Sequence, residues 1–229
     1  AATGTDDCVN DIDIQCGSET YPLASIQEAI NRAMDSNLIV VFPGIYAAIS
    51  INKNVIIKSR YQTNEALIYQ TIIDADSVSS AVTFIGTDES SSLKGFTIRG
   101  GYSQKGAGIY LEGANPTLEK LIIYDNNTTI TEGLGGGIYC IDSSPIINKV
   151  TIADNFGTVG GGIYIDDQSI PVIINSIIWN NSNLPIHQNW SGSSISISNS
   201  NNIDFILSKF CSIEQDILYN SKAVFNLGF

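Results

Sequence analysis

The chain has 229 residues, 43% of them hydrophobic and 15% charged, which is enough for one large domain with a substantial core. Its net charge of −12 at pH 7 argues against nucleic acid and anionic membrane surfaces as partners, because both would repel it. No apolar run approaches the length of a membrane span, so we expect no membrane insertion.

Residues 1–24 are polar and are expected to form a loop. Cys8 and Cys16 lie close together in it, and we predict a disulfide between them, with two free thiols as the alternative. The aspartates around these cysteines offer ligands for Ca²⁺, the one cofactor that the loop suggests. They are Asp6, Asp7, Asp11 and Asp13.

A single helix is predicted over residues 25–34. Ser25 and Glu28 have the spacing of a capping box, in which each side chain bonds the other residue's backbone N–H. Apolar residues follow at helical spacing on one face: Ile26, Ala29, Ile30, Ala33 and Met34. One short amphipathic helix before an otherwise all-β chain is expected to cover the open first coil of a solenoid.

From residue 38 onward the pattern is one of short β-branched strands separated by polar turns. Three units in the middle of the chain share a Gly-x-Gly-Ile-Tyr run, a proline and an Asp-Asn or Asn-Asn pair. Their tyrosines, Tyr110, Tyr139 and Tyr164, are 29 and 25 residues apart. Each unit contains three short strands, so the repeat predicts an all-β parallel β-helix with three strands per coil.

Side-chain alternation assigns the faces of these strands. Isoleucines at the Gly-Ile-Tyr strand and at the strand before Asp-Asn should stack inward, and Cys140 should be a small core residue beside them. The tyrosines should point outward as a ladder. Asn126, Asn155 and Asn181 should stack at a corner, where an Asn side chain can bond turn backbone.

After Trp179 the pattern loosens into Ser- and Asn-rich sequence. We therefore predict one domain over residues 1–229. It consists of the loop 1–24, the helix 25–34, coils over 38–181, and irregular C-terminal coils and a tail over 182–229.

Two stretches resemble right-handed parallel β-helix proteins of the pectin-lyase-like superfamily. Residues 24–46 are similar to their N-terminal capping helix and first coil, and the GGGIY…SPIINKVTIADN units resemble the repeats of their large secreted and cell-surface members. The resemblance implies right-handed winding, as parallel crossovers also do. It further implies a secreted, extracellular or cell-surface location.

The resemblance does not extend to the catalytic motifs of that superfamily. The Asn-Thr-Asp, Gly-His-Gly and Arg-x-Lys motifs of polygalacturonases are absent, and so are the esterase contexts. The lyases use a basic residue beside acidic calcium ligands, and basic residues are few here. We therefore expect no enzymatic activity and assign no catalytic or metal-binding residue.

The ladder of Tyr110, Tyr139 and Tyr164 is the best binding-surface candidate. Trp179, a further candidate, and Trp190 could extend an apolar surface near the C-terminal end. The aromatic faces of the ladder could stack sugars or pack on another chain. The alternative is that stacked tyrosines only stabilise the sheet.

Other residues carry weaker predictions. The lone histidine, His187, is expected to be a surface loop residue, and the pairs Asp74/Asp76 and Asp125/Asp154 are expected to be turn residues rather than catalytic or calcium-binding carboxylates. Four asparagines lie in Asn-x-Ser/Thr sequons and are candidate glycosylation sites: Asn126, Asn127, Asn180 and Asn189.

Two functional hypotheses follow. The first is a non-catalytic structural protein of the cell surface or matrix, which self-assembles end to end or binds other surface proteins, because an uncovered last coil exposes unpaired backbone. The second is a polysaccharide-binding or polysaccharide-degrading β-helix. The acidic composition makes anionic uronates poor partners unless calcium bridges them.

Overall fold

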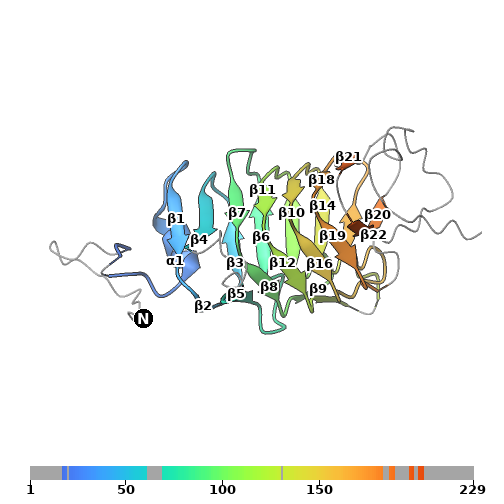
Figure 1. Ribbon diagram of the computed structural model, residues 1–229, viewed down its shortest axis with the longest axis horizontal. Coiled ribbons are helices and arrows are strands. Elements are labelled where there is room, and N and C mark those ends of the chain that lie inside the picture. The colour runs from blue at the N-terminus through green and yellow to red at the C-terminus, as the bar shows by residue number, and fades with distance from the viewer. Residues whose placement is uncertain are drawn as a thin grey trace, which may run out of the picture.

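The structure is a computed structural model that describes residues 17–19, 21–60, 69–129, 131–182, 186–188, 196–198 and 201–203. It is an elongated solenoid in which short strands stack along the long axis (Figure 1). Every strand pair in the described residues is parallel, and neighbouring strands in a sheet come from successive coils. The predicted parallel β-helix with three strands per coil is therefore confirmed.

Three long sheets run the length of the solenoid. Sheet A has the order β1 (Leu38–Val41), β4 (Ile56–Ser59), β7 (Ser92–Lys94), β11 (Thr117–Glu119), β15 (Ile146–Asn148), β18 (Val172–Ile174) and β21 (Ser196–Ser198). Sheet B has the order β2 (Gly44–Tyr46), β5 (Thr71–Asp74), β8 (Thr97–Arg99), β12 (Ile122–Tyr124), β16 (Thr151–Ala153), β19 (Ile177–Trp179) and β22 (Asn201–Ile203).

Sheet C has the order β3 (Ile49–Ile51), β6 (Val82–Ile85), β10 (Ile109–Glu112), β14 (Ile138–Ile141), β17 (Ile163–Ile165) and β20 (Ile186–Gln188). Two very short strands, β9 (Tyr102–Ser103) and β13 (Asn127–Thr128), pair with each other between sheets B and C. The strands β20, β21 and β22 continue the three sheets in the region where we expected irregular coils.

The core is a column of aliphatic rungs inside the three sheets. Ile109, Ile138 and Ile163 face one another in register and are fully buried, as predicted. Ile123, Ile152 and Ile178 form the matching stack in sheet B, and Cys140 is buried beside the first stack. A shift of one residue would turn each of these stacks to the surface, so the buried rungs fix the register.

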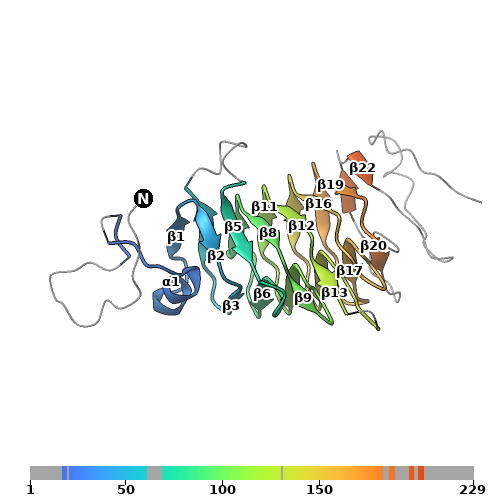
Figure 2. The same cartoon turned by 90° about the horizontal axis from the view of Figure 1, so that it is seen from below.

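One helix, α1 (Ile26–Arg32), covers the N-terminal end of the solenoid (Figure 2). The Ser25 hydroxyl accepts a hydrogen bond from the Glu28 N–H at 3.1 Å, which confirms the Ser25 half of the capping box. Ile26 and Ile30 are buried against the first coil. The predicted end at residue 34 is wrong: the helix ends at Arg32, and Met34 is 73% exposed rather than part of the apolar face.

Two side chains tie this helix to the first coil. The Gln27 amide accepts a hydrogen bond from the Ser50 N–H at 2.7 Å and donates one to the Ser50 carbonyl at 3.2 Å. The Gln27 side chain thus makes the hydrogen bonds that a neighbouring strand would otherwise make with the edge strand β3. The Lys53 ammonium donates to the carbonyls of Ile30, Asn31 and Ala33 at 3.1, 2.8 and 2.8 Å, which satisfies the last turn of the helix. None of the helices in the described residues is long and apolar enough to cross a membrane.

Candidate functional site

The three tyrosines of the repeats form the predicted column on the outside of sheet C. Tyr110, Tyr139 and Tyr164 occupy matching positions in β10, β14 and β17. Their ring centroids are 5.5 and 5.1 Å apart, and the ring planes are nearly parallel, at 5° and 12°. The column is therefore a continuous aromatic stack along the solenoid axis.

This tyrosine column is covered rather than open. Tyr139 and Tyr164 are only 3% and 8% exposed, and Tyr110 is half-buried. The Lys105 ammonium lies 5.5 Å from the centre of the Tyr139 ring, and the Tyr110 hydroxyl donates to a Glu112 carboxylate oxygen at 3.0 Å. The expectation of an exposed aromatic platform is thus wrong for Tyr139 and Tyr164.

A glycine turn explains the covering. Gly135 has φ +65°, and a Cβ there would lie 2.3 Å from the Ile138 carbonyl oxygen and 3.0 Å from the Cα of Tyr139. The backbone before Gly-Ile-Tyr therefore folds directly against the tyrosine strand. Leu134 pairs with Lys105 on one side and Val159 on the other, so the segments before the glycines run side by side along the column.

Burial also sets the acidity of the column. It raises the pKa of Tyr139 to about 12, with smaller contributions from Tyr164 and Tyr110. The pKa of Tyr110 also rises to about 12, through burial first and then through its hydrogen bond to Glu112. Both hydroxyls therefore stay protonated at neutral pH.

Trp179 lies on a different surface. It is in β19, on sheet B, beside Ala153 of β16, and it is 51% exposed. The tyrosine column lies on sheet C. Trp179 therefore exposes apolar surface near the C-terminal end, but on another face than the tyrosine ladder.

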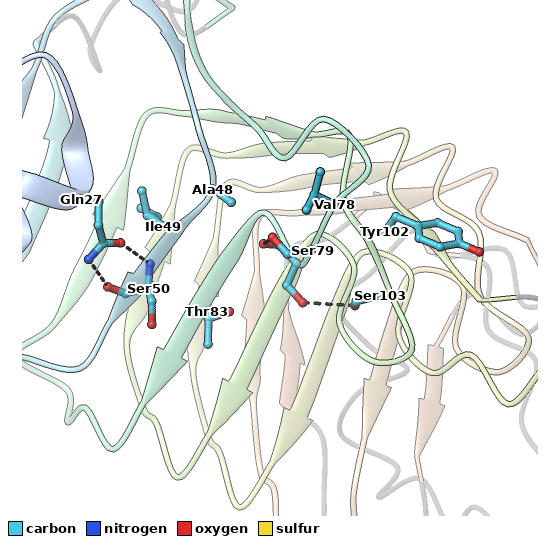
Figure 3. A pocket seen from close by; sticks show the side chains of 10 residues that line it. Gln27, Ala48, Ile49, Ser50, Val78, Ser79, Thr83, Tyr102 and Ser103 are labelled. Carbon is cyan, nitrogen blue, oxygen red and sulfur yellow. Dashed lines mark hydrogen bonds between the residues drawn. The ribbon is translucent and has the colours of Figure 1, made fainter.

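A shallow hollow lies where the tyrosine column ends. Figure 3 shows the side chains that line it. In sheet C the position next to Tyr110 is Thr83, and the one after that is Ser50. The hollow has a volume of about 540 Å³. Its lining residues are Gln27, Ala48, Ile49, Ser50, Val78, Ser79, Ser80, Thr83, Tyr102 and Ser103.

Sequence reasoning missed this hollow. The sequence does contain a sign of it. The outward position of sheet C is tyrosine in three successive coils, and in the two coils before them it is threonine and serine. The walls were not foreseeable, since they come from residues 78–80 and 102–103, which lie outside the repeated motif.

The predicted asparagine stack is confirmed at the corner between sheets B and C. Asn155 Nδ2 donates to the carbonyls of Ile123 and Ala153 at 2.9 and 3.0 Å and to Asn181 Oδ1 at 2.9 Å. Its Oδ1 accepts from the backbone N–H and the side chain of Asn126, at 3.2 and 2.9 Å. The amides thus link three consecutive coils.

The same geometry separates the candidate glycosylation sites. Asn126 is fully buried and its Nδ2 donates three hydrogen bonds, so a glycan on it is incompatible with this fold. Asn127 and Asn180 are exposed and remain predictions. Asn189 lies outside the described residues.

The carboxylates that we had weighed as ligands are mostly engaged in structural contacts. Asp74 is the last residue of strand β5 and not the turn residue that we expected. It accepts a hydrogen bond from Arg99 Nε at 2.8 Å, and Arg99 also donates to the Tyr124 hydroxyl at 3.3 Å. The hydrogen bond to Tyr124, and after it the one to Asp74, raises the pKa of Arg99 above its ordinary value. Asp125 and Asp154 occupy turn positions with φ 52° and 54°. In the described part of the chain, no group of histidine, cysteine or acidic residues has the arrangement of a metal site.

The remaining candidates give little chemistry. Burial raises the pKa of the Cys140 thiol strongly, so this thiol is unreactive. His187 lies in strand β20, where its backbone pairs with Tyr164, so the expectation of a surface loop is wrong. Cys8, Cys16, Cys211 and the four aspartates of the N-terminal loop lie outside the described residues.

Comparison with protein families gives one result. The family model described as a right-handed beta helix region matches residues 62–225, which is well over half of the chain. Comparison with curated proteins found no match, and comparison with solved structures found none. The family match thus supports the winding direction and the repeat but carries no activity with it.

Proposed function

The chain belongs to the right-handed β-helix family, and on that premise we propose that it is a non-catalytic structural module of the cell surface or extracellular matrix. The fold alone does not select this function, since one fold hosts many. The proposal rests on how the polar and aromatic side chains of the outer faces are used.

The observation that carries the proposal is that outward and corner side chains contact one another along the solenoid axis, from coil to coil. The tyrosine stack, the asparagine stack and the Asp74–Arg99–Tyr124 chain each join residues from successive coils. Side chains that bond along the axis stiffen a solenoid, because each coil otherwise contacts only its neighbours. Such a use favours a mechanical role over catalysis.

An extracellular location is part of the proposal. It rests on the predicted Cys8–Cys16 disulfide, which would be stable in an oxidising compartment. The proposal includes end-to-end assembly at the N-terminal end only if the helix α1 moves away. The helix α1 covers the first coil, so a head-to-tail contact at that end requires α1 to move.

The test combines activity with mechanics. The purified protein is incubated with pectin, alginate and neutral polysaccharides, while new reducing ends and unsaturated products are measured. In parallel, single molecules are unfolded by atomic force microscopy. We expect no product, and a high unfolding force that falls in Asn155→Ala. Release of products would contradict the proposal, and so would an unfolding force that is low or indifferent to this substitution.

A second candidate function is polysaccharide binding, and one observation favours it. The hollow beside Tyr110 is open and has an uncharged lining of hydroxyl groups and apolar side chains, unlike the covered tyrosine column. Binding there requires no catalytic group.

A further inference from the structure

The hollow exists because of a change in side-chain size along one column. From Tyr164 to Tyr110 the outer groove of sheet C is filled by stacked rings. At the next two positions, Thr83 and Ser50, the side chains are too small to fill it. Gln27 of α1 closes the far end, where it bonds the Ser50 backbone (Figure 3).

The wall of this hollow is held in place by hydrogen bonds. The Tyr102 N–H donates to the Ser79 carbonyl at 2.9 Å, and the Ser80 hydroxyl donates to the Ser103 hydroxyl at 3.1 Å. The Ser103 hydroxyl in turn donates to the Lys105 carbonyl at 2.6 Å. The two wall segments, residues 78–80 and 102–103, are therefore coupled to each other, and the hollow is formed before any ligand arrives.

The lining combines hydroxyl groups with apolar surface from Ala48, Ile49 and Val78. It carries the hydroxyls of Ser50, Ser79, Ser80, Thr83 and Ser103 together with the amide of Gln27 and the ring of Tyr102. No residue of this lining is charged. Tyr102 is 44% exposed at the rim, where an aromatic face can stack on the apolar face of a sugar ring.

From this lining we propose that the hollow binds a neutral saccharide, with hydroxyl groups of the sugar bonded to the serine and threonine side chains and one ring packed on Tyr102. The volume of about 540 Å³ lies within the range of about 300–1,000 Å³ of small-molecule sites. A charged ligand is disfavoured, because the lining offers no counter-charge and the chain as a whole carries −12. This inference rests on the second candidate function, polysaccharide binding, and is independent of the mechanical role.

The structure suggests a substitution that removes the hollow without disturbing the fold. A tyrosine at position 83 would sit beside Tyr110 as Tyr110 sits beside Tyr139, and it would extend the stack into the hollow. Thr117→Tyr is the matched control, because Thr117 is a half-buried outward residue of β11 on sheet A. Tyr102→Ala tests the stacking residue separately and changes no residue of the three long sheets.

Binding is measured by isothermal titration calorimetry and by NMR of the sugar. The probes are α- and β-linked tetrasaccharides of glucose, mannose, galactose and xylose, with tetragalacturonate as the anionic comparison. We expect at least one neutral probe to bind, tetragalacturonate not to bind, and the affinity to fall roughly tenfold or more in Thr83→Tyr and several-fold in Tyr102→Ala. Thr117→Tyr should bind like the unmodified protein.

Three results would overturn the proposal: no binding of any neutral probe, equal binding of tetragalacturonate, or binding that survives both substitutions. Thermal unfolding of each variant shows whether it is folded. Should Thr83→Tyr fail to fold, Tyr102→Ala decides alone. Each of these results leaves the mechanical role standing, because that role is judged by product release and unfolding force.

Discussion

Asn155 shows most directly how single residues hold the coils together. It is 1% exposed. The amide nitrogen donates hydrogen bonds to three oxygens, and the amide oxygen accepts from two nitrogens, so that three coils are joined. A buried polar partner that is left unpaired costs about 1–3 kcal/mol. The Asn155→Ala substitution leaves several such partners unpaired at once.

We therefore expect Asn155→Ala to lower the free energy of unfolding by about 4 kcal/mol, measured by urea denaturation. Asn148→Ala is the control, because Asn148 lies on the outer face of sheet A and its side chain accepts one hydrogen bond, from Asn175 at 3.0 Å. The control should lose less than about 1 kcal/mol. Equal losses in the two variants would show that the corner stack has no special role.

The tyrosine column predicts a loss of stability at high pH. An unfolded tyrosine has a pKa of about 10, whereas the pKa of Tyr139 and that of Tyr110 are each about 12 in the fold. Below about pH 10 both states hold these protons, so the free energy of unfolding does not change. Between about pH 10 and 12 the unfolded state loses its protons first, and stability falls as the pH rises.

This fall is measured as the thermal midpoint at a series of alkaline pH values, together with the ultraviolet absorbance of tyrosinate. Tyr139→Phe removes one of the late-titrating hydroxyls, so one late ionisation should disappear and the fall should become shallower. Tyr21→Phe is the control, because Tyr21 is 50% exposed. A column in which Tyr139 ionises together with exposed tyrosines would contradict the covered geometry.

At the scale of elements, the glycine turn decides how each tyrosine strand begins. Gly135 and Gly113 both have positive φ, +65° and +56°. A Cβ on Gly135 would meet backbone at 2.3 Å, whereas a Cβ on Gly113 would meet nothing within 4 Å. Alanine at Gly113 therefore tests the conformational cost of a positive φ alone, and alanine at Gly135 tests that cost together with a steric clash.

We expect Gly113→Ala to cost about 1–2 kcal/mol, which is the price of a left-handed conformation alone. Gly135→Ala should cost clearly more, on the order of 3 kcal/mol or above, because the turn must also move away from the strand. Urea denaturation measures both, and near-ultraviolet circular dichroism reports on the tyrosine stack. Similar losses for both alanines would mean that the turn is not packed against the strand as described.

The Lys53 side chain hydrogen-bonds the C-terminal end of the capping helix. It is the side-chain donor to three carbonyls of the last turn of α1. Lys53→Met keeps the aliphatic stem and removes these bonds, so the free energy of unfolding should fall by about 1–2 kcal/mol in urea denaturation. Lys149→Met, at an exposed turn position, should leave it nearly unchanged. A loss no larger than in the control would mean that solvent satisfies the helix end equally well.

What could be predicted from the sequence follows from periodicity. The isoleucine stacks and the asparagine stack recur at the same place in each repeat, so the alternation of side chains fixes both their direction and their register. The covering of Tyr139 was not predictable in this way. It depends on the turn at Gly135 and on the neighbouring segments around Lys105 and Leu134, whose path the repeat does not encode.

The hollow was missed for a related reason. It arises from small side chains at Ser50 and Thr83, in coils that precede the recognisable repeats. Trp179 was grouped with the tyrosines although it stands in the strand before Asn-Asn, which belongs to sheet B. A sequence repeat thus shows which residues stack along the axis, but loops between the sheets decide which of them reach solvent.

At the scale of the whole molecule, the helix α1 covers the N-terminal end of the solenoid. The first strands β1, β2 and β3 stand at the edges of their sheets, and edge strands recruit other chains when their backbone groups are unpaired. The helix α1 prevents this at β3 through Gln27 and covers the first rung with Ile26 and Ile30. We therefore expect the cap to limit end-to-end stacking of the solenoid.

We expect the double substitution Ile26→Glu and Ile30→Glu to detach α1, because two buried side chains would become charged. The first coil would then be open, and the variant should form oligomers that grow with concentration in light scattering and appear as end-to-end stacks in negative-stain electron microscopy. Met34→Glu, at a position that is 73% exposed just after the helix, should stay like the unmodified protein. Circular dichroism shows whether the β-helix itself persists. A variant that keeps its β-structure but remains monomeric at every concentration would show that α1 is not what limits growth, and that the solenoid ends are blocked by other means.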